Sequence, residues 1–165
     1  MIESIVLGLG SNTGNRYSYL NRAVREICLT EGFNFIALSS VYKTEPWGYK
    51  NQNEFLNCVL VCLCRLKPAE ALKKVKSIEK KIGRVKRQKW HEREIDIDIL
   101  FYGEQSAAVN GLVIPHPHLH ERNFALQPLR ELMPGFIHPV MKKSIETIHR
   151  ESKDRAKTFL YKTYN

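Results

Sequence analysis

The chain has 165 residues and is 43% hydrophobic, enough for one packed domain and too much for overall disorder. Its apolar runs fall well short of the roughly 18 residues that a membrane span needs. It also starts without the basic region of a signal peptide, so we expect a cytoplasmic protein. Lysine and arginine total 26 against 17 acidic residues, a net charge of +9. This surplus favours a polyanionic partner: nucleic acid, an anionic membrane or a phosphorylated small molecule.

The first elements expected along the chain are a strand and an amphipathic helix. Residues 5–9 form a compact apolar run that is typical of a strand. Apolar residues then recur at helical spacing over residues 20–28, with Asn15 as the candidate N-cap and Gly32 as the candidate residue after the helix. Three glycines lie near this junction, at Gly8, Gly10 and Gly14. Their spacing differs from that of a dinucleotide-binding fingerprint at the third glycine, so we assign them to a tight strand-to-helix turn.

The rest of the chain carries further strand and helix patterns. Strands are predicted over residues 33–42, 55–64, 95–101 and 112–114, and helices over residues 68–83 and 144–151. The run over 55–64 is apolar on both faces, which indicates an interior strand. The order strand, helix, strand, strand, helix, strand predicts an α+β fold of the ferredoxin-like, split βαβ type, with helices packed on an antiparallel sheet. We expect one domain over 1–165, with a core at about 4–130 and a C-terminal helix and tail over 131–165.

The four cysteines are expected to be structural. Three of them alternate with apolar residues in the predicted strand 55–64 and share one face, where they act as small buried hydrophobic residues. No Cys-x-x-Cys spacing is present, so neither a disulfide nor a zinc site is favoured for Cys28, Cys58, Cys62 and Cys64.

An aspartate pair is the first candidate for chemistry. Side chains alternate along a strand, so Asp96 and Asp98 share one face while the neighbouring isoleucines take the other. Carboxylates at this spacing suit one or two Mg²⁺ ions, which bind oxygen ligands together with substrate phosphates. A solvated acidic strand face is the alternative.

A basic loop, residues 84–93, runs directly into this strand. Arginine forks in it match phosphate oxygens, and its Trp90 can stack on a planar ring. Glu79, on the preceding helix, lies at the edge of the apolar stripe. It is either a rim residue or a group that hydrogen-bonds a ligand between helix and sheet. A cationic loop that leads into a diacid strand is the layout expected for a nucleoside triphosphate with Mg²⁺.

Three histidines at alternate positions leave two other functions open. His116, His118 and His120 could serve a zinc hydrolase, although we expect one of them to be a phosphate donor instead. The positive charge and the fold also permit an RNA-binding module, but the aromatic stretch of such modules is missing from the interior strands. Stoichiometric zinc and salt-dependent RNA binding would distinguish these alternatives.

Several motifs taken together resemble the 6-hydroxymethyl-7,8-dihydropterin pyrophosphokinase family of folate biosynthesis. The resemblance spans roughly residues 4–130, and its most specific part is the Arg93-Glu94-Ile95-Asp96-Ile97-Asp98 segment. The other motifs are Leu9-Gly10-Ser11-Asn12, residues 42–48, Gln52-Asn53-Glu54-Phe55-Leu56-Asn57, Glu79 before Gly83-Arg84, Trp90, Pro115-His116-Pro117, and Arg122-Asn123-Phe124 with Pro128-Leu129.

The resemblance implies an ATP-dependent diphosphokinase that moves pyrophosphate from ATP to the hydroxymethyl oxygen of the pterin and releases AMP. It implies that Asp96 and Asp98 bind two Mg²⁺ ions and that Arg84, Arg93, Asp96 and Asp98 are catalytic. Implied ATP contacts are Glu79, Arg84, Lys86, Trp90, Arg93, Ile99, His116 and Arg122. Implied pterin contacts are Thr44, Glu45, Trp47, Phe55, Asn57, Asp96 and Phe124.

The same resemblance implies that the basic loop closes over the bound substrates. Phe55 stands where a tyrosine is often found, which keeps stacking and removes a hydroxyl, and His91-Glu92 replace a smaller pair. The expected partners are the two small-molecule substrates, with no nucleic acid and no membrane, and we expect a monomer.

Overall fold

The computed structural model describes residues 2–46, 51–87, 91–109 and 111–164, and its main feature is one antiparallel sheet between two pairs of helices. The elements in chain order are β1 (Glu3–Ser11), α1 (Arg16–Leu29), β2 (Phe33–Leu38), β3 (Val41–Thr44), β4 (Phe55–Cys64), α2 (Pro68–Ile82), β5 (Asp96–Tyr102), β6 (Ala107–Val109), β7 (Leu112–Ile114), a short 3-10 turn (Leu119–Glu121), α3 (Asn123–Leu132), α4 (Ile145–Glu151) and β8 (Thr158–Lys162).

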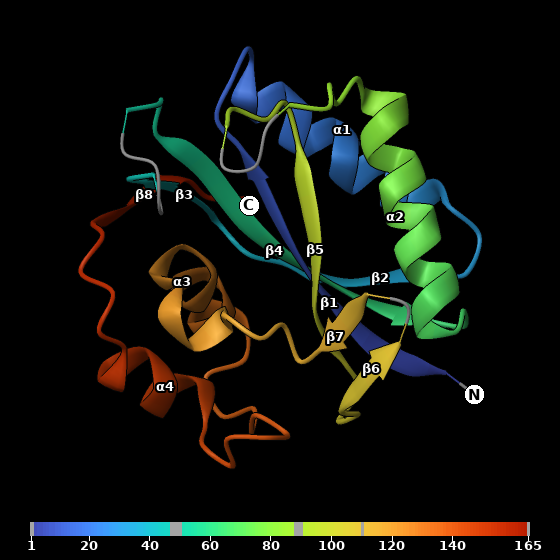
Figure 1. The fold of residues 1–165 in the computed structure, drawn as a ribbon, viewed down its shortest axis with the longest axis vertical. Helices are drawn as coiled ribbons and strands as arrows, with labels where there is room; N and C mark the ends of the chain where they lie inside the picture. The colour runs from blue at the N-terminus through green and yellow to red at the C-terminus, as the bar shows by residue number, and fades with distance from the viewer. Residues whose placement is uncertain (1, 47–50, 88–90, 110, 165) are drawn as a thin grey trace.

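The main sheet has the strand order β5-β1-β4-β3-β8, and β2 pairs with β4 beside β3. Every pairing within it is antiparallel, and β6 and β7 form a separate hairpin. This order, with α1 after β1 and α2 before β5, confirms the predicted ferredoxin-like α+β fold (Figure 1).

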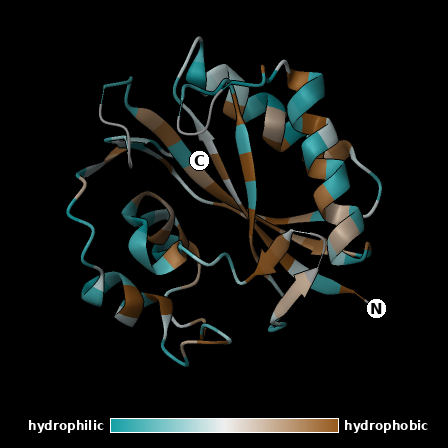
Figure 2. Cartoon of the chain, viewed as in Figure 1, coloured by the Kyte–Doolittle hydropathy of each residue, from teal (hydrophilic) through white to brown (hydrophobic). Residues whose placement is uncertain are grey.

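Each face of the sheet has its own core. On one face, α1 and α2 pack on the alternate residues of β1, β4 and β5 through Leu20, Ala23, Ile27, Val75, Ile78 and Ile82. On the other face, α3 and α4 pack through Ala125, Leu126, Leu129, Ile145 and Ile148. Figure 2 shows hydrophobic residues along the central strands and hydrophilic ones on the outer surfaces of the helices. Because α3 covers only part of its face, a cavity remains beside it.

Local signals set most of the helix ends. Asn15 caps α1 by accepting a hydrogen bond from the Ser18 amide at 3.0 Å, as predicted. Gly83 ends α2 with a φ of 111°, which suits glycine at a helix C-terminus. The prediction for Gly32 is wrong in position: α1 ends at Leu29, and Gly32 lies in the turn to β2 with a φ of 98°.

The predicted strand over 33–42 is two strands. The break falls at Ser39 and Ser40, whose hydroxyl groups bond outside the strand ladder. The Ser39 hydroxyl accepts from the Val59 amide at 2.8 Å, and the Ser40 amide and hydroxyl both donate to Glu131 of α3, at 2.9 and 3.0 Å. Sequence patterns give no sign of this break because its partners are distant in the chain.

One α-helix and two strands are missing from the sequence prediction, besides the short 3-10 turn. Pro128 lies inside α3 and hides its helical pattern, while β6 and β8 are short and become strands only through their partners. The tail is therefore more than a helix and polar residues, because β8 extends the main sheet at its edge. The predicted strand 112–114 and the helix starting after Ser144 are confirmed. Within the described residues, no helix is long and apolar enough to cross a membrane.

The predicted cysteine environment is confirmed for the strand residues. Cys58, Cys62 and Cys64 are buried in the core under α1 and α2, and all four cysteines carry free thiols. Burial raises the pKa of the Cys58 thiol to about 12.

Candidate active site

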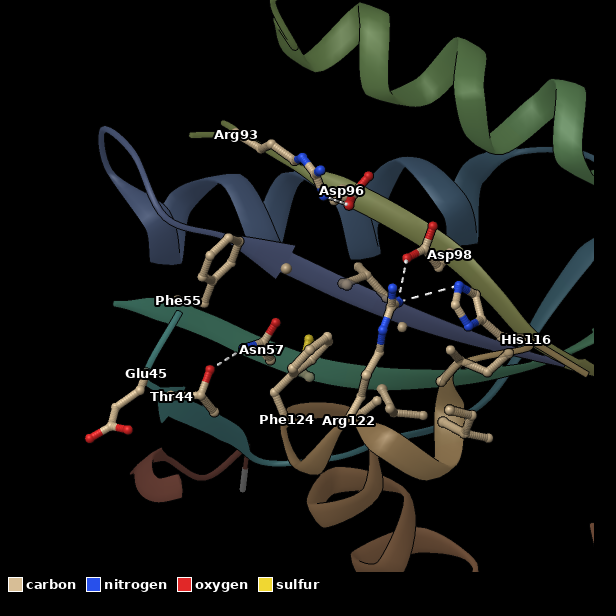
Figure 3. Close-up of a pocket in the computed structure, with 18 of the residues that line it drawn as sticks. Thr44, Glu45, Phe55, Asn57, Arg93, Asp96, Asp98, His116, Arg122 and Phe124 are labelled. Atoms are coloured by element: carbon tan, nitrogen blue, oxygen red, sulfur yellow. Dashed lines mark hydrogen bonds and ion pairs between the residues drawn. The ribbon is translucent and has the colours of Figure 1, made fainter. Parts of the chain in front are cut away.

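A cavity of about 340 Å³ lies on the α3 face of the sheet. Its floor is formed by three neighbouring strands in a fixed register. Gly10 of β1 lies opposite Asp96 of β5 on one side and opposite Asn57 of β4 on the other. The register therefore places Asp96, Gly10 and Asn57 in one row across the sheet. Figure 3 shows Asp96 and Asn57 on neighbouring parts of the cavity, with Phe55 and Phe124 near Asn57.

The two aspartates differ in their surroundings. Asp96 is 17% exposed in its side chain and pairs with Arg93 and, at 3.0 Å, with Arg84. Asp98 has a weaker partner, since the nearest guanidinium nitrogen of Arg122 is 3.9 Å away. Burial, with repulsion from Asp96 added to it, raises the pKa of Asp98 to about 6. In the absence of ligands, Asp98 is thus a carboxylate without full charge compensation.

The glycines of β1 have a role that the sequence prediction did not give them. Gly8 and Gly10 lie within the strand, so their assignment to a turn is wrong, whereas Gly14 does lie in the loop, with a φ of 62°. A Cβ atom on Gly10 would be 2.7 Å from the Asn57 Oδ1 atom, and one on Gly8 would press on Leu100 at 3.2 Å. The missing side chains keep the centre of the cavity open.

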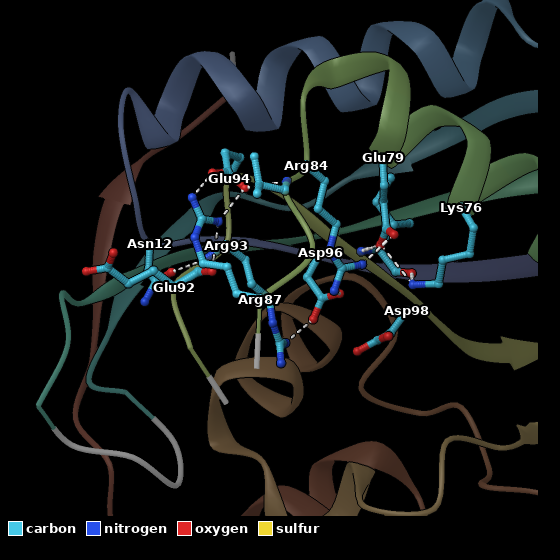
Figure 4. A network of polar contacts seen from close by, with 12 residues as sticks. Asn12, Lys76, Glu79, Arg84, Arg87, Glu92, Arg93, Glu94, Asp96 and Asp98 are labelled. Carbon is cyan, nitrogen blue, oxygen red and sulfur yellow. Dashed lines mark hydrogen bonds and ion pairs between the residues drawn. The ribbon is translucent and has the colours of Figure 1, made fainter. Parts of the chain in front are cut away.

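A charged network fixes one wall of the cavity (Figure 4). Glu79 is 2% exposed and accepts hydrogen bonds from the Ile97 amide at 2.7 Å, from Lys76 at 2.8 Å and from Arg84. Lys76 also donates to the Ile97 carbonyl at 3.0 Å. Glu79 therefore joins α2 to β5 and holds two cations at the edge of the cavity.

The two ends of the basic loop are also held in place. Arg87 forms two hydrogen bonds to Glu94, at 2.9 and 2.6 Å, and lowers the pKa of that carboxyl to about 2. Asn12 accepts from the Arg93 amide at 2.7 Å and donates to Gln52 at 3.0 Å. These contacts tie the start of β5 to the end of β1, so Arg93 enters the cavity from a fixed backbone.

The opposite wall is built for a flat polar ring. Asn57 is 5% exposed and donates to the Thr44 hydroxyl at 2.7 Å. Phe55 of β4 and Phe124 of α3 both line the cavity and flank Asn57. Two aromatic faces beside a buried amide suit a heteroaromatic ring with hydrogen-bonding edges.

Arg122 lies between the two halves of the site. Its guanidinium is 3.3 Å from the His116 Nε2 atom and 5.7 Å from the centre of the Phe124 ring. Burial, together with the nearby Arg122 charge, lowers the pKa of His116 to about 4. His116 is therefore neutral at physiological pH, where it can donate or accept one hydrogen bond.

The cavity collects eleven of the residues predicted from the sequence: Thr44, Glu45, Phe55, Asn57, Arg84, Arg93, Asp96, Asp98, His116, Arg122 and Phe124. Three other described residues do not line it. Glu79 positions Arg84 and Lys76, Lys86 is exposed on the basic loop, and the Ile99 side chain lies in the core on the other face of β5. Trp47 and Trp90 lie outside the described residues, so their predicted roles, and closure of the loop, stay predictions.

Sequence reasoning missed several lining residues, among them Gln52, Lys76 and His91. Lys76 had a usable signal, because it lies three residues before Glu79 on the same helix face. Among the described residues, no three His, Cys, Asp or Glu side chains are grouped to hold a metal ion. His118 instead faces Glu121 at 3.1 Å, so the geometry gives a zinc hydrolase no support.

An acidic pair, converging arginines and an aromatic slot on a ferredoxin-like sheet fit an enzyme that transfers a phosphoryl-type group to a small ring substrate. Comparison with known proteins identifies its family. Residues 6–134 match the model of the 7,8-dihydro-6-hydroxymethylpterin-pyrophosphokinase (HPPK) family, and the chain belongs to that family. It is an enzyme of the diphosphokinase type, acting on hydroxymethyldihydropterin in folate synthesis.

Named relatives agree with this assignment. The chain is 42% identical over 151 residues to a 2-amino-4-hydroxy-6-hydroxymethyldihydropteridine pyrophosphokinase of Aquifex aeolicus, covering 92% of this chain and 93% of the relative. It is 35% identical over 164 residues to the folic acid synthesis protein fol1 of Pneumocystis carinii, covering 97% of this chain but 22% of that protein.

Solved structures confirm the fold. The structure of Plasmodium falciparum HPPK-DHPS with pteroate superposes with a TM-score of 0.75 at 15% identity. The match covers 92% of this chain and 44% of the Plasmodium chain. The ferredoxin-like arrangement is therefore shared even where few residues are.

Proposed function

We propose that the two ends of the cavity divide the reaction between them, with ATP phosphates at the β5 end and the pterin at the β4 end. The observation that carries this division is the β5-β1-β4 register, which sets Asp96, Gly10 and Asn57 side by side. ATP would donate its β- and γ-phosphates as one pyrophosphoryl group to the hydroxymethyl oxygen, with AMP as the leaving group. Because the acceptor oxygen attacks directly, no covalent enzyme intermediate is needed.

The chain's own cations would supply part of the charge compensation for the phosphates. Arg84, Arg93 and Arg122 converge on the β5 end, and Lys76 lines the same wall. Arg84 and Arg93 are paired with Asp96 in the absence of ligand. When phosphates enter, we expect both guanidinium groups to turn part of their donors to phosphate oxygens, which they match in geometry. Charge that develops on the transferred group then meets donors already in place.

Asp96 and Asp98 fit a magnesium site. Mg²⁺ is usually held by one or two protein carboxylates together with substrate phosphates and water, and these two residues supply that number. The raised pKa of Asp98, a partly desolvated carboxylate beside Asp96, means that a bound cation would stabilise its charged form. Bound Mg²⁺ would neutralise phosphate charge and orient the phosphates. Two ions, as in the family resemblance, is the proposed number.

Asn57, Phe55, Thr44 and Phe124 are the proposed pterin residues. Asn57 carries both a donor and an acceptor, which matches an amide edge of the pterin. Its hydrogen bond to the Thr44 hydroxyl fixes the side-chain amide before the substrate arrives. The two phenylalanine rings exclude water and stack on the bicyclic ring. Glu45 lines the same end of the cavity and is the proposed contact at its rim.

The product formed from ATP tests the reaction. Incubation with ATP, Mg²⁺ and 6-hydroxymethyl-7,8-dihydropterin is expected to give AMP and the pterin diphosphate in equal amounts. Formation of ADP would show ordinary kinase chemistry and contradict the proposal. Asn57→Ala should raise the pterin KM by about tenfold or more, because buried polar groups lose their partner. Asn34→Ala, in the exposed part of β2, is the matched control and should leave KM unchanged.

A monomeric state and a cytoplasmic location are the remaining proposals. The cavity is lined by residues of one chain, and a single copy can therefore hold both substrates. Light scattering at assay concentration tests the first of these proposals, and cell fractionation tests the second.

A further inference from the structure

The C-terminal segment after α4 crosses back to the edge of the active site. From Ser152 it runs past the 3-10 turn, where the Ser152 hydroxyl donates to the His120 carbonyl at 3.2 Å, and then enters β8 beside β3 (Figure 1). The HPPK family match ends at residue 134, so this segment lies outside it. Its contacts concentrate in residues 154–158, which we name the clasp.

The clasp caps the helix that carries Phe124. Asp154 accepts a hydrogen bond from the Asn123 amide at 2.8 Å, at the first residue of α3. The Asn123 side chain in turn donates to the Ala156 carbonyl at 3.1 Å and to the Thr158 hydroxyl at 3.3 Å. First-turn amides of a helix have no partner within the helix, and a carboxylate there also meets the positive end of the helix dipole.

The same five residues hold the strand that carries Thr44. Thr158 lies opposite Thr44 in the β3-β8 pairing, and the Glu45 amide donates to the Lys157 carbonyl at 3.4 Å. Asp154 stiffens the clasp internally, because its other oxygen accepts from the Ala156 amide at 2.9 Å. One short segment is therefore bonded to both walls of the proposed pterin slot.

The far end of α3 has a separate anchor. Glu131 accepts from the Ser40 amide at 2.9 Å and from the Tyr42 hydroxyl at 2.7 Å, next to the break between β2 and β3. This anchor is remote from Phe124, which is on the first turn of α3. Without the clasp, the first turn would be free to fray while the rest of the helix stays packed.

We propose that the clasp, and Asp154 in particular, sets the spacing between Phe124 and the Thr44–Asn57 wall, and so positions the pterin. The inference rests on the proposed function, since it takes Phe124 and Asn57 as the pterin residues. Asp154 touches neither substrate and is a positioning residue. Its loss should weaken pterin binding while the ATP end of the cavity, held by Glu79 and Asn12, keeps its geometry.

Paired variants test the clasp. Asp154→Ala should raise the pterin KM about fivefold, the scale of a lost helix cap, with less than a twofold change in the KM for ATP. Asp154→Asn keeps an acceptor and should restore most of the affinity. Arg155→Ala, at an exposed position of the clasp, is the matched control and should behave as the unmodified protein. Asn123→Ala removes the side-chain bonds to Ala156 and Thr158 but leaves the contact of its backbone amide to Asp154. It should cause a smaller rise in the pterin KM, and it tests the clasp if Asp154→Ala does not fold.

The outcomes separate this inference from the proposed function. If Phe124→Ala leaves the pterin KM unchanged, the site assignment fails and the clasp has nothing to position. If Phe124→Ala weakens pterin binding but Asp154→Ala and Asn123→Ala match Arg155→Ala, the clasp is refuted and the site stands. Equal losses for ATP and pterin in the Asp154 and Asn123 variants would also refute positioning, since they indicate a general loss of structure.

Discussion

Replacing Asp98 by asparagine is expected to remove activity and stabilise the ligand-free protein at the same time. The variant keeps the shape of the side chain and loses its charge. We expect kcat/KM to fall at least about 100-fold with saturating Mg²⁺, equal to about 2.7 kcal/mol of transition-state stabilisation. The physical reason is that a proposed metal ligand beside the phosphates is lost.

The stability change follows from the shifted pKa of Asp98. A rise from 3.8 to about 6 corresponds to about 3 kcal/mol of unfavourable ionisation if the group were dry. The Asp98 side chain is 37% exposed, however, so solvent screens much of this, and about 1 kcal/mol is the expected gain in the variant. That is a rise of about 2–4 °C in the melting temperature for a chain of this size.

The shifted pKa of Asp98 also makes the stability of the protein depend on pH. Folded Asp98 holds its proton more tightly than the unfolded chain does, so between about pH 4 and pH 6 the folded state binds more protons. Rising pH therefore destabilises the unmodified protein across that window. Asparagine lacks this effect, so the advantage of the variant should be absent below about pH 4 and complete above about pH 6.

Urea unfolding with EDTA, followed by circular dichroism across pH 4–8, measures the stability difference, and AMP formation measures turnover. Asp96→Asn is the control, because it should also lose turnover but breaks the ion pairs to Arg84 and Arg93 and so should not be stabilised. The reasoning is refuted if Asp98→Asn is destabilised at pH 7–8, or if its turnover is near normal with saturating Mg²⁺.

Three further predictions concern the other parts of the site. Phe124→Ala should weaken pterin binding by about 1–3 kcal/mol, the scale of aromatic stacking on a base, and calorimetry should show a much smaller change for ATP alone. Gly10→Ala should raise the pterin KM because its Cβ atom would displace the Asn57 amide, whereas Gly135→Ala, with open space around the added atom, should not; the idea fails if steady-state kinetics show equal effects. Because the pKa of His116 is lowered to about 4, the unfolded chain binds the extra proton between about pH 6.5 and pH 4, so stability is lost as the pH falls through that window; His116→Gln should flatten this part of the urea stability profile, and an unchanged slope would contradict the assignment.

The sequence alone determined the elements whose signals are local. Alternation over β5 separates Asp96 and Asp98 from the isoleucines, and Pro68 and Gly83 bound α2, because period and turn chemistry act over a few residues. The motifs also gave the family, since most of its site residues stand in recognisable short segments. The sequence could therefore name eleven of the residues that line the cavity.

Only the tertiary structure decided the features that depend on partners distant in the chain. Local sequence places Gly8 and Gly10 in a turn, but β1 pairs on both sides. The register puts Gly10 between Asp96 and Asn57, and Gly8 between Asp98 and Val59, so both form open floor of the cavity. Glu79 is occupied by Lys76, Arg84 and the β5 backbone, a set of contacts that helix spacing alone cannot give. The C-terminal segment forms strand β8 because the free edge of β3 supplies backbone hydrogen-bond partners. It caps α3 because the Asn123 amide, at the first residue of that helix, needs an acceptor and finds Asp154. Side-chain period specifies which face a residue takes, whereas the residue it meets there is set by strand order and register.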